Sequence, residues 1–303
     1  MEKIKVLLDT DIGSDIDDAL ALSYLLSEPR CELMGITTVT GEPHKRALMA
    51  HLLCSMAGKE VPIYPGASLP MFGKQHQPVA PHAEVLKNYN LSRTFPEGEA
   101  IRFMQKTIRE NPGEIVLLGI APLTNIGLLF SIDPEIPRLL KGLVLMCGVF
   151  HYELPELIDH KYEWNAIGDP FATSLVYNTK VGMHRSIGLD VTYRVTMGRN
   201  EALCQFNSRL LEPVQAFSEH HAYPHITFHD PLAAMSIFHD DILSYQKGSV
   251  HLEYGDEHYE GMTRWTAGEG IHEVAHEVDR EVFFERYFST TADTIGEGFP
   301  VGS

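Results

Sequence analysis

Cysteine is scarce in this chain, and its spacing argues against two common architectures. The four cysteines, Cys31, Cys54, Cys147 and Cys204, lie far apart and form no Cys-x-x-Cys pair. This pattern predicts reduced, mostly buried thiols rather than a disulfide framework or a zinc site. No uncharged apolar run is long enough to span a bilayer, and carboxylates begin at Asp9, too early for the apolar segment of a signal peptide. We therefore expect a cytoplasmic protein with no membrane partner.

Basic residues are also few. The chain has 24 lysines and arginines against 41 aspartates and glutamates, which gives a net charge of −17. Such an acidic balance argues against nucleic acid or an anionic membrane as a partner. Hydrophobic residues make up 44% and charged residues 21%, as in an ordinary globular protein with ample core. Because no repeat, low-complexity tract or linker interrupts the sequence, we expect a single domain over residues 1–303.

Carboxylates are concentrated near the start of the chain. A short apolar strand at residues 4–8 runs directly into five acids, which are Asp9, Asp11, Asp15, Asp17 and Asp18. Like charges this close repel one another unless a cation is near, and clustered hard oxygen ligands suit Ca²⁺ or Mg²⁺. Capping of the helix that follows would explain one Asp but not five. The segment therefore predicts a divalent cation site.

Strand and helix patterns alternate along the first half of the chain. Strands are expected at 4–8, 32–39, 63–66, 114–119 and 143–146, with helices at 17–26, 44–57, 98–110 and 124–130. This alternation predicts an α/β fold with a mostly parallel, Rossmann-like central sheet flanked by helices. Ligands of such sheets bind at the carboxyl ends of strands, where the acids lie. Later helices are expected at 169–177, 200–221 and 280–288, and residues 67–96 are expected to form a long loop at the site.

Four separated stretches carry a resemblance to a known family. They are Asp9-Thr-Asp-Ile-Gly with Asp17-Asp18-Ala-Leu-Ala-Leu, Pro122-Leu-Thr-Asn-Ile, Glu163-Trp-Asn165 with Asp169-Pro170, and His229-Asp230-Pro231-Leu-Ala. In this order they resemble the calcium-dependent nucleoside hydrolases of the inosine–uridine-preferring type. The ending Glu277-Val-Asp-Arg-Glu-Val-Phe-Phe also looks like the last helix of that family. The likeness extends over nearly the whole chain.

The resemblance implies hydrolysis of the N-glycosidic bond of a ribonucleoside, or a close relative, to free base and ribose. Ca²⁺ would be ligated by the carboxylates of Asp11, Asp18 and Asp230 and by the backbone carbonyl of Thr124, with a water and two ribose hydroxyls completing its coordination. Asp11 would be the general base that directs the water at C1′, through an oxocarbenium-like transition state. The family also implies a homodimer or homotetramer.

The same resemblance assigns the substrate contacts. Glu163 and Asn165 match the ribose-binding pair, and Asp17 would bond a ribose hydroxyl. His229 matches the histidine that contacts the base, and it would protonate the leaving purine or pyrimidine. His82 is a weaker match to a second base-contacting histidine, because the family's His-Gly pattern is missing there.

This chain departs from the family pattern at three places. The acidic loop has two extra residues, so Asp15 has no simple counterpart and would replace or assist Asp17. Glu42 stands where the family has Asn after the second strand; it could accept a bond from a ribose hydroxyl but could not donate one. Leu157 replaces another Asn, six residues before Glu163. Contacts to the base and to the 5′-hydroxyl therefore stay open.

Two other functions, one enzymatic and one not, are also compatible with parts of this sequence. A phosphatase of the haloacid dehalogenase type also places Asp-x-Asp after a first strand, but it requires a hydroxyl residue where this chain has Gly13. A protein that binds nucleosides or sugars through calcium without turnover would explain the changes at Glu42 and Leu157. Retention of Asp11 and His229 favours an enzyme, because binding alone needs neither a base nor an acid.

Overall fold

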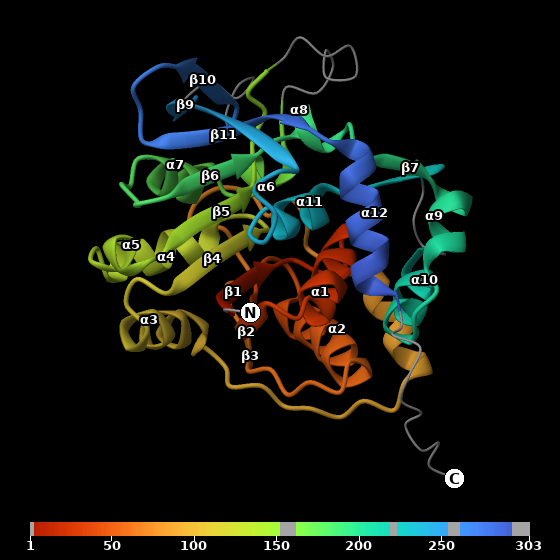
Figure 1. Ribbon diagram of the computed structural model, residues 1–303. Coiled ribbons are helices and arrows are strands. Elements are labelled where there is room, and N and C mark those ends of the chain that lie inside the picture. Colours follow the sequence, from red (N-terminus) through yellow and green to blue (C-terminus); the bar gives the residue numbers. More distant parts are fainter. Residues whose placement is uncertain (1–2, 152–161, 219–222, 254–260, 293–303) are drawn as a thin grey trace.

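A computed structural model describes residues 3–151, 162–218, 223–253 and 261–292, and its centre is one nine-stranded sheet (Figure 1). The strand order is β10-β9-β11-β6-β5-β4-β1-β2-β3. The strands are β1 (Ile4–Thr10), β2 (Cys31–Thr38), β3 (Ile63–Pro65), β4 (Ile115–Ile120), β5 (Gly142–Met146), β6 (His184–Ile187), β9 (Leu243–Leu252), β10 (Thr263–Ala267) and β11 (His272–Val278). Neighbours from β3 to β11 pair in parallel, whereas β9 and β10 add antiparallel strands at one edge. The predicted mostly parallel α/β fold is confirmed.

The order of the first strands creates the place where a ligand binds in such sheets. From β1 the chain crosses to β2 and β3 on one side, whereas β4, β5 and β6 follow on the other side. Between β1 and β4 the direction of winding reverses, which opens a crevice at the carboxyl ends of these two strands. The carboxylates predicted for the site follow β1 directly, so they lie at this crevice.

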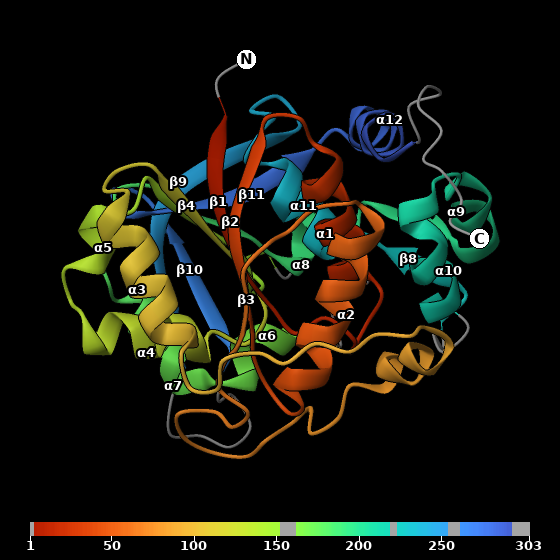
Figure 2. The same ribbon diagram turned by 90° about the horizontal axis from the view of Figure 1, so that it is seen from below.

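Helices cover both faces of the sheet (Figure 2). They are α1 (Asp17–Ser27), α2 (Pro43–Met56), α3 (Ala100–Glu110), α4 (Thr124–Ile132), α5 (Ile136–Leu139), α6 (Trp164–Gly168), α7 (Pro170–Tyr177), α8 (Leu189–Thr192), α9 (Arg199–Gln205), α10 (Glu212–Ser218), α11 (His229–Met235) and α12 (Arg280–Thr291), with a 3-10 helix η1 at Pro81–Asn88. Val6 and Leu8 pack with the core that includes α1, α2, α11 and α12, whereas Leu7 packs with the core under α3, α4 and α7. This division follows from the alternation of side chains along a strand.

The stretch predicted as one helix over 200–221 is interrupted, and that prediction is wrong. It contains α9, a 3-10 turn at Arg209–Leu211, and α10, which ends at Ser218, the last residue of this described range. Ser208 has extended backbone dihedrals, which break the helical hydrogen bonding between α9 and the turn. Beyond it, a small antiparallel pair of strands, β7 (Thr196–Gly198) and β8 (His225–Thr227), leads into α11.

The cysteines have the environment that their spacing predicts. All four cysteines are free, and three of them are buried, as expected. None of the helices within the described ranges combines the length and apolar character needed to cross a membrane. Leu157 lies outside the described residues.

A buried histidine in the core on the α7 side of the sheet leads to a prediction about pH and stability. His184 stacks on Tyr177 and meets His272 edge-on, and neither of its ring nitrogens has a partner among the described residues. Burial, reinforced by His272, lowers the pKa of His184 to about 3. Between this value and the ordinary pKa near 6.5, only the unfolded chain is protonated, so stability falls as the pH drops.

We expect His184→Leu to remove this dependence, because leucine cannot take up a proton. Between pH 6.5 and pH 5, the free energy of unfolding of the parent chain should fall relative to the variant by roughly 2 kcal/mol, at about 1.4 kcal/mol per pH unit. Urea unfolding of both proteins at several pH values measures the difference. A difference that is independent of pH would show that the pKa of His184 is the same in the folded and in the unfolded chain.

Candidate active site

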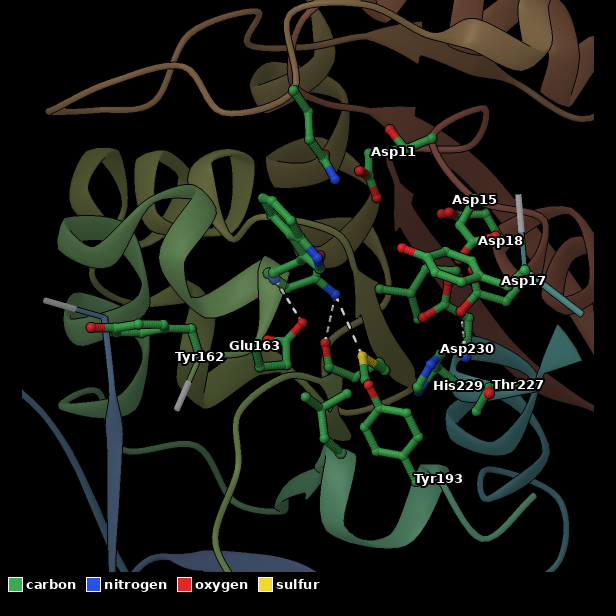
Figure 3. A pocket seen from close by; sticks show the side chains of 18 of the residues that line it. Asp11, Asp15, Asp17, Asp18, Tyr162, Glu163, Tyr193, Thr227, His229 and Asp230 are labelled. Atoms are coloured by element: carbon green, nitrogen blue, oxygen red, sulfur yellow. Dashed lines mark hydrogen bonds between the residues drawn. The ribbon is translucent and has the colours of Figure 1, made fainter. Parts of the chain in front are cut away.

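A cavity of about 380 Å³ opens at the carboxyl ends of β1 and β4 (Figure 3). Its walls combine acids, aromatic residues and histidines. They include Asp11, Ser14, Asp15, Asp17, Asp18, Gln77, Ile120, Met146, Tyr162, Glu163, Trp164, Asn165, Leu189, Tyr193, Tyr223, His225, Thr227, His229 and Asp230. Within the described parts of the chain, no lysine or arginine lines this cavity. It is therefore suited to a neutral, polar ligand or a cation.

Three carboxylates converge on one side of this cavity. Asp17, Asp18 and Asp230 each offer an oxygen, and these oxygens all lie within 4.8 Å of one another. Asp17 and Asp18 begin α1, Asp230 lies in the first turn of α11, and the two helices pack together. Burial, reinforced by mutual repulsion, raises the pKa of all three well above the usual range. A bound divalent cation would relieve this repulsion, so the cluster is compatible with a metal site.

Asp11 faces the same group from the end of β1 (Figure 3). Its side chain is buried, and burial raises its pKa although the guanidinium of Arg46 acts in the opposite direction. Asp11 repels Asp17, Asp18 and Asp230 electrostatically. The structure therefore brings together the four acids that the sequence assigned to the cation and to the ribose.

Asp9 does not belong to this group, because hydrogen bonds hold its side chain away from the cavity. One of its oxygens accepts bonds from Thr37 Oγ1 at 2.6 Å and from Asn125 Nδ2 at 2.8 Å, and the residue does not line the cavity. Burial raises the pKa of Asp9 to about 7. Asp9 thus ties β1 to β2 and α4, behind the site.

Asp15, the acid with no simple counterpart in the family, does line the cavity. It is half-buried, and its Oδ1 accepts a bond from the backbone N–H of Ile16 at 2.6 Å. Its charge acts on both Asp11 and His229. The extra residues of the acidic loop therefore add a carboxylate to the site rather than to the surface.

Glu163 lies across the cavity from the acids (Figure 3), and Asn165 also lines the cavity. Glu163 caps α6, and its carboxylate accepts bonds from the backbone N–H groups of Gly148, Asn165 and Ala166 at 2.7–3.0 Å. Burial raises its pKa to about 7 despite these bonds. Asn165 Nδ2 donates to the carbonyl of Met146 at 2.9 Å, at the end of β5. Both side chains are fixed before any ligand arrives, as a pair that binds vicinal hydroxyls needs.

His229 precedes Asp230 at the start of α11 and lines the cavity. Its Nδ1 lies 2.6 Å from Thr192 Oγ1, and its ring meets Tyr193 edge-on at 5.4 Å. Burial lowers its pKa to about 4, with Asp15 acting in the opposite direction. With Nδ1 engaged by Thr192, the other ring nitrogen is the one available to a ligand.

Three of the residues proposed from the sequence do not reach the cavity. Thr124 begins α4 and donates its hydroxyl to Asp169 Oδ2 at 2.7 Å. Glu42 is held outside by Lys45 at 2.6 Å and by the backbone N–H of Ala80. His82 is buried and its ring stacks on Phe217. None of them is among the lining residues, so the suggested substrate contacts of Glu42 and His82 gain no support.

Other residues of the cavity carried little signal in the sequence. Ile120 is the last residue of β4 and lines the cavity, although its side chain has no polar group. Tyr193 follows α8 and Gln77 belongs to the loop before η1. Of these, only Gln77 lay in a stretch expected to border the site, the loop over 67–96.

Comparison with known proteins agrees with this geometry. Residues 6–285 match the family described as inosine-uridine preferring nucleoside hydrolase. The chain belongs to this family. Among related nucleoside hydrolases, uridine nucleosidase 1 of Arabidopsis thaliana is 28% identical over 271 residues, which are 82% of this chain and 78% of that protein. The chain is therefore an enzyme of the ribonucleoside hydrolase group.

Solved structures of nucleoside hydrolases share the fold. A plant nucleoside hydrolase, PpNRh1, superposes with a TM-score of 0.80 at 21% identity, over 96% of this chain and 99% of that one. A purine-preferring ribonucleoside hydrolase from Gardnerella vaginalis superposes with a TM-score of 0.76 at 22% identity, over 95% and 98% of the two chains. At these identities the likeness concerns the architecture alone.

Proposed function

We propose that this enzyme uses Ca²⁺ to hydrolyse the N-glycosidic bond of ribonucleosides to free base and ribose. The observation that carries the proposal is the convergence of Asp11, Asp17, Asp18 and Asp230 opposite Glu163 in one cavity. Hard carboxylate oxygens fit Ca²⁺, which accepts many oxygen ligands in flexible geometry. Bound there, Ca²⁺ would supply a charge that orients the ribose and favours deprotonation of a water.

The cation would be held by the carboxylates of Asp11, Asp18 and Asp230. The family resemblance also implied the backbone carbonyl of Thr124 as a ligand, but Thr124 does not line the cavity. Ile120 does, at the carboxyl end of β4 beside β1, so its carbonyl is the better placed backbone ligand. Asp17 would then bond a ribose hydroxyl.

The residues of the chain divide the chemistry between them. Asp11 would accept the proton of the attacking water, which is directed at C1′. Glu163 and Asn165 would hold the ribose, and the surrounding carboxylates would stabilise the positive charge that develops on the sugar. His229 would be the acid for the departing base. Because burial lowers its pKa to about 4, the ring is neutral near pH 7 and would donate from its Nε2–H, with Nδ1 accepting from Thr192. Asp15 would assist Asp17 at the edge of the sugar.

Release of ribose from a panel of nucleosides tests this function. Uridine is the first substrate to try, because several curated relatives are named uridine nucleosidases; cytidine, inosine and adenosine complete the panel. Uridine 5′-monophosphate should be a poor substrate, because the cavity has many carboxylates and, among the described residues, no lysine or arginine to bind a phosphate. No release from any nucleoside by protein shown to contain Ca²⁺ would favour a binding role without turnover.

The location and assembly of the enzyme are also part of this proposal. Four free cysteines favour a reducing compartment such as the cytoplasm. The family resemblance favours a homodimer or homotetramer. Light scattering of the purified protein would measure the assembly, and a monomer would contradict it.

The proposed acid role of His229 predicts a dependence on the leaving group. We expect His229→Ala to lower kcat for uridine or inosine by about 10²-fold or more. For p-nitrophenyl riboside the loss should be under about tenfold, because this leaving group needs little help from an acid. Parallel kinetics on both substrates measure the ratio. Equal losses would show that His229 is structural.

A further inference from the structure

Arg46 is a fully buried arginine beside the acidic loop, and the proposed function gives it no role. It lies in the first turns of α2, and its side chain has no exposed surface. Among the described residues it forms no hydrogen bond or ion pair with a carboxylate. A buried guanidinium without a carboxylate partner is costly unless other groups satisfy its donors. Its contacts therefore need an explanation.

In the acidic segment, Arg46 donates to two backbone carbonyls and one side-chain hydroxyl. Nη1 donates to the carbonyl of Asp11, to the carbonyl of Ile12 at 3.2 Å and to Ser14 Oγ at 2.9 Å. These acceptors lie in the part of the loop between β1 and Asp15. Because the guanidinium binds carbonyls rather than carboxylates, it leaves the acid oxygens available to a cation and a ribose.

The same side chain reaches two further loops. Nε donates to the carbonyl of Thr40 at 2.8 Å, and Nη2 to the carbonyl of Val79 at 3.4 Å. Thr40 has a φ of +66°, which is unfavourable for a residue with a branched side chain. Arg46 thus joins the acidic segment, the turn after β2 and the loop before η1.

The joined loops form one wall of the cavity. A Cβ built on Gly41 would lie 2.2 Å from the carbonyl of Gln77, so the turn at Thr40 and Gly41 packs closely against the loop that carries Gln77. Glu42 accepts a bond from the backbone N–H of Ala80, next to Val79. Gln77 and Ser14 both line the cavity. A shift of Arg46 would therefore move the acidic segment and the loop that carries Gln77 together.

The positive charge of Arg46 adds to this geometry. It attracts Asp11 and Asp18, whereas the acids of the loop repel one another. A loop that carries several like charges would otherwise relax towards solvent. One buried cation at its base opposes that opening without occupying the cavity.

We propose that Arg46 is a positioning residue that holds the segment from Asp11 to Ser14 in the conformation that binds the cation, and couples it to the loop of Gln77. It acts through Asp11 and does not touch the substrate. Its effects on turnover and on cation binding rest on the proposed function, whereas its effect on the loops does not.

The test compares Arg46→Lys with Arg30→Lys. Lysine keeps the charge but cannot bind three loops at once. Arg30 is a matched control because it is partly buried, bonds Glu28 and the carbonyl of Phe238, and lies at the opposite, amino-terminal edge of the strands. For Arg46→Lys we expect Ca²⁺ affinity, measured by calorimetry with Ca²⁺ alone, to fall by about tenfold or more. Arg30→Lys should stay within about twofold of the parent affinity.

Two further readouts separate positioning from general destabilisation. In Arg46→Lys, kcat should fall by about 10–100-fold with a smaller change in KM, and amide hydrogen exchange should accelerate at residues 11–18 and 75–80 but not in β4. Unchanged Ca²⁺ affinity, kcat and exchange would overturn the proposal. If Arg46→Lys does not fold, Ser14→Ala removes one acceptor of the guanidinium and should weaken Ca²⁺ binding several-fold; no change would again overturn it. Loss of Ca²⁺ affinity in a protein that hydrolyses no nucleoside would refute the proposed function and leave Arg46 standing.

Discussion

Asp11→Asn is expected to lower kcat/KM for ribonucleosides by about 10³-fold or more. Asparagine fills the same space, but it carries no charge and cannot accept the proton of an attacking water. Asp11 lies at the end of β1 within the cavity, where both the cation and C1′ of a ribose would be in reach. The same change should weaken Ca²⁺ binding, since a carboxylate ligand is lost. Steady-state ribose release and calorimetry with Ca²⁺ measure the two effects.

Asp9→Asn is the matched control for this variant. Asp9 lies two residues earlier and is equally buried, but it bonds Thr37 and Asn125 instead of facing the cavity. We expect its replacement to reduce thermal stability while kcat stays within several-fold of the parent value. If both variants lost activity equally, a change in the packing of the segment would explain the loss, and Asp11 would have no role as a base.

The local patterns of the sequence predicted the fold class, although not the break within residues 200–221. Residues 115–120 are an unbroken apolar run, and in the structure every one of them is buried because helices cover both faces of the parallel strand. The carboxylates after β1 were found because ligands of parallel sheets bind at the carboxyl ends of strands, whereas the pair at Glu163 and Asn165 was assigned by the family resemblance. Residues far apart in sequence could therefore be assigned to one site.

Several contacts at the site depend on tertiary structure and left no local trace. Glu42 could not be placed from the sequence, because its capture by Lys45 and Ala80 depends on where the loop before η1 runs. Ile120 offers a backbone group, and a backbone carbonyl gives no signal in residue type. Arg46 was missed for the same reason, since most of its acceptors are carbonyls from three loops. The sequence thus identifies the acids but not the groups that hold them.

The family match and the positions of Asp9 and Glu42 bear on the two alternative functions, a phosphatase and a non-catalytic binding protein. Membership of the hydrolase family removes the phosphatase reading, which had rested on Asp9 and Asp11 alone. In the structure these two acids do not act as a pair, since Asp9 is turned away from the cavity. The non-catalytic alternative was based on the changes at Glu42 and Leu157; Glu42 lies outside the cavity, and Leu157 lies outside the described residues. His229 and Asp230 both line the cavity, which is where the proposed acid would have to lie and which simple binding would not need.

Removal of the cation is expected to abolish turnover and to destabilise the fold. After prolonged incubation with EDTA, ribose release should fall by about 10³-fold or more, because the ribose loses its orienting charge and the water loses its activation. The cluster of Asp17, Asp18 and Asp230 would also be left as buried, mutually repelling carboxylates. At a Ca²⁺ concentration of about 1,000 times Kd, binding adds roughly 4 kcal/mol to stability, so Tm should fall by roughly 5 °C or more on chelation.

Restoration by different ions identifies the cation. Ca²⁺ should restore full activity, whereas Mg²⁺ should restore little, because Mg²⁺ keeps several waters and is held by only one or two carboxylates. The proposed ligands, the carboxylates of Asp11, Asp18 and Asp230 with the carbonyl of Ile120, are more protein groups than Mg²⁺ normally uses. Better restoration by Mg²⁺ would keep the cation site but replace the ion. Undiminished turnover in protein shown to be free of metal would contradict the proposed cation site. In that case one buried carboxylate of the cluster would act as the general base while its neighbours stayed protonated.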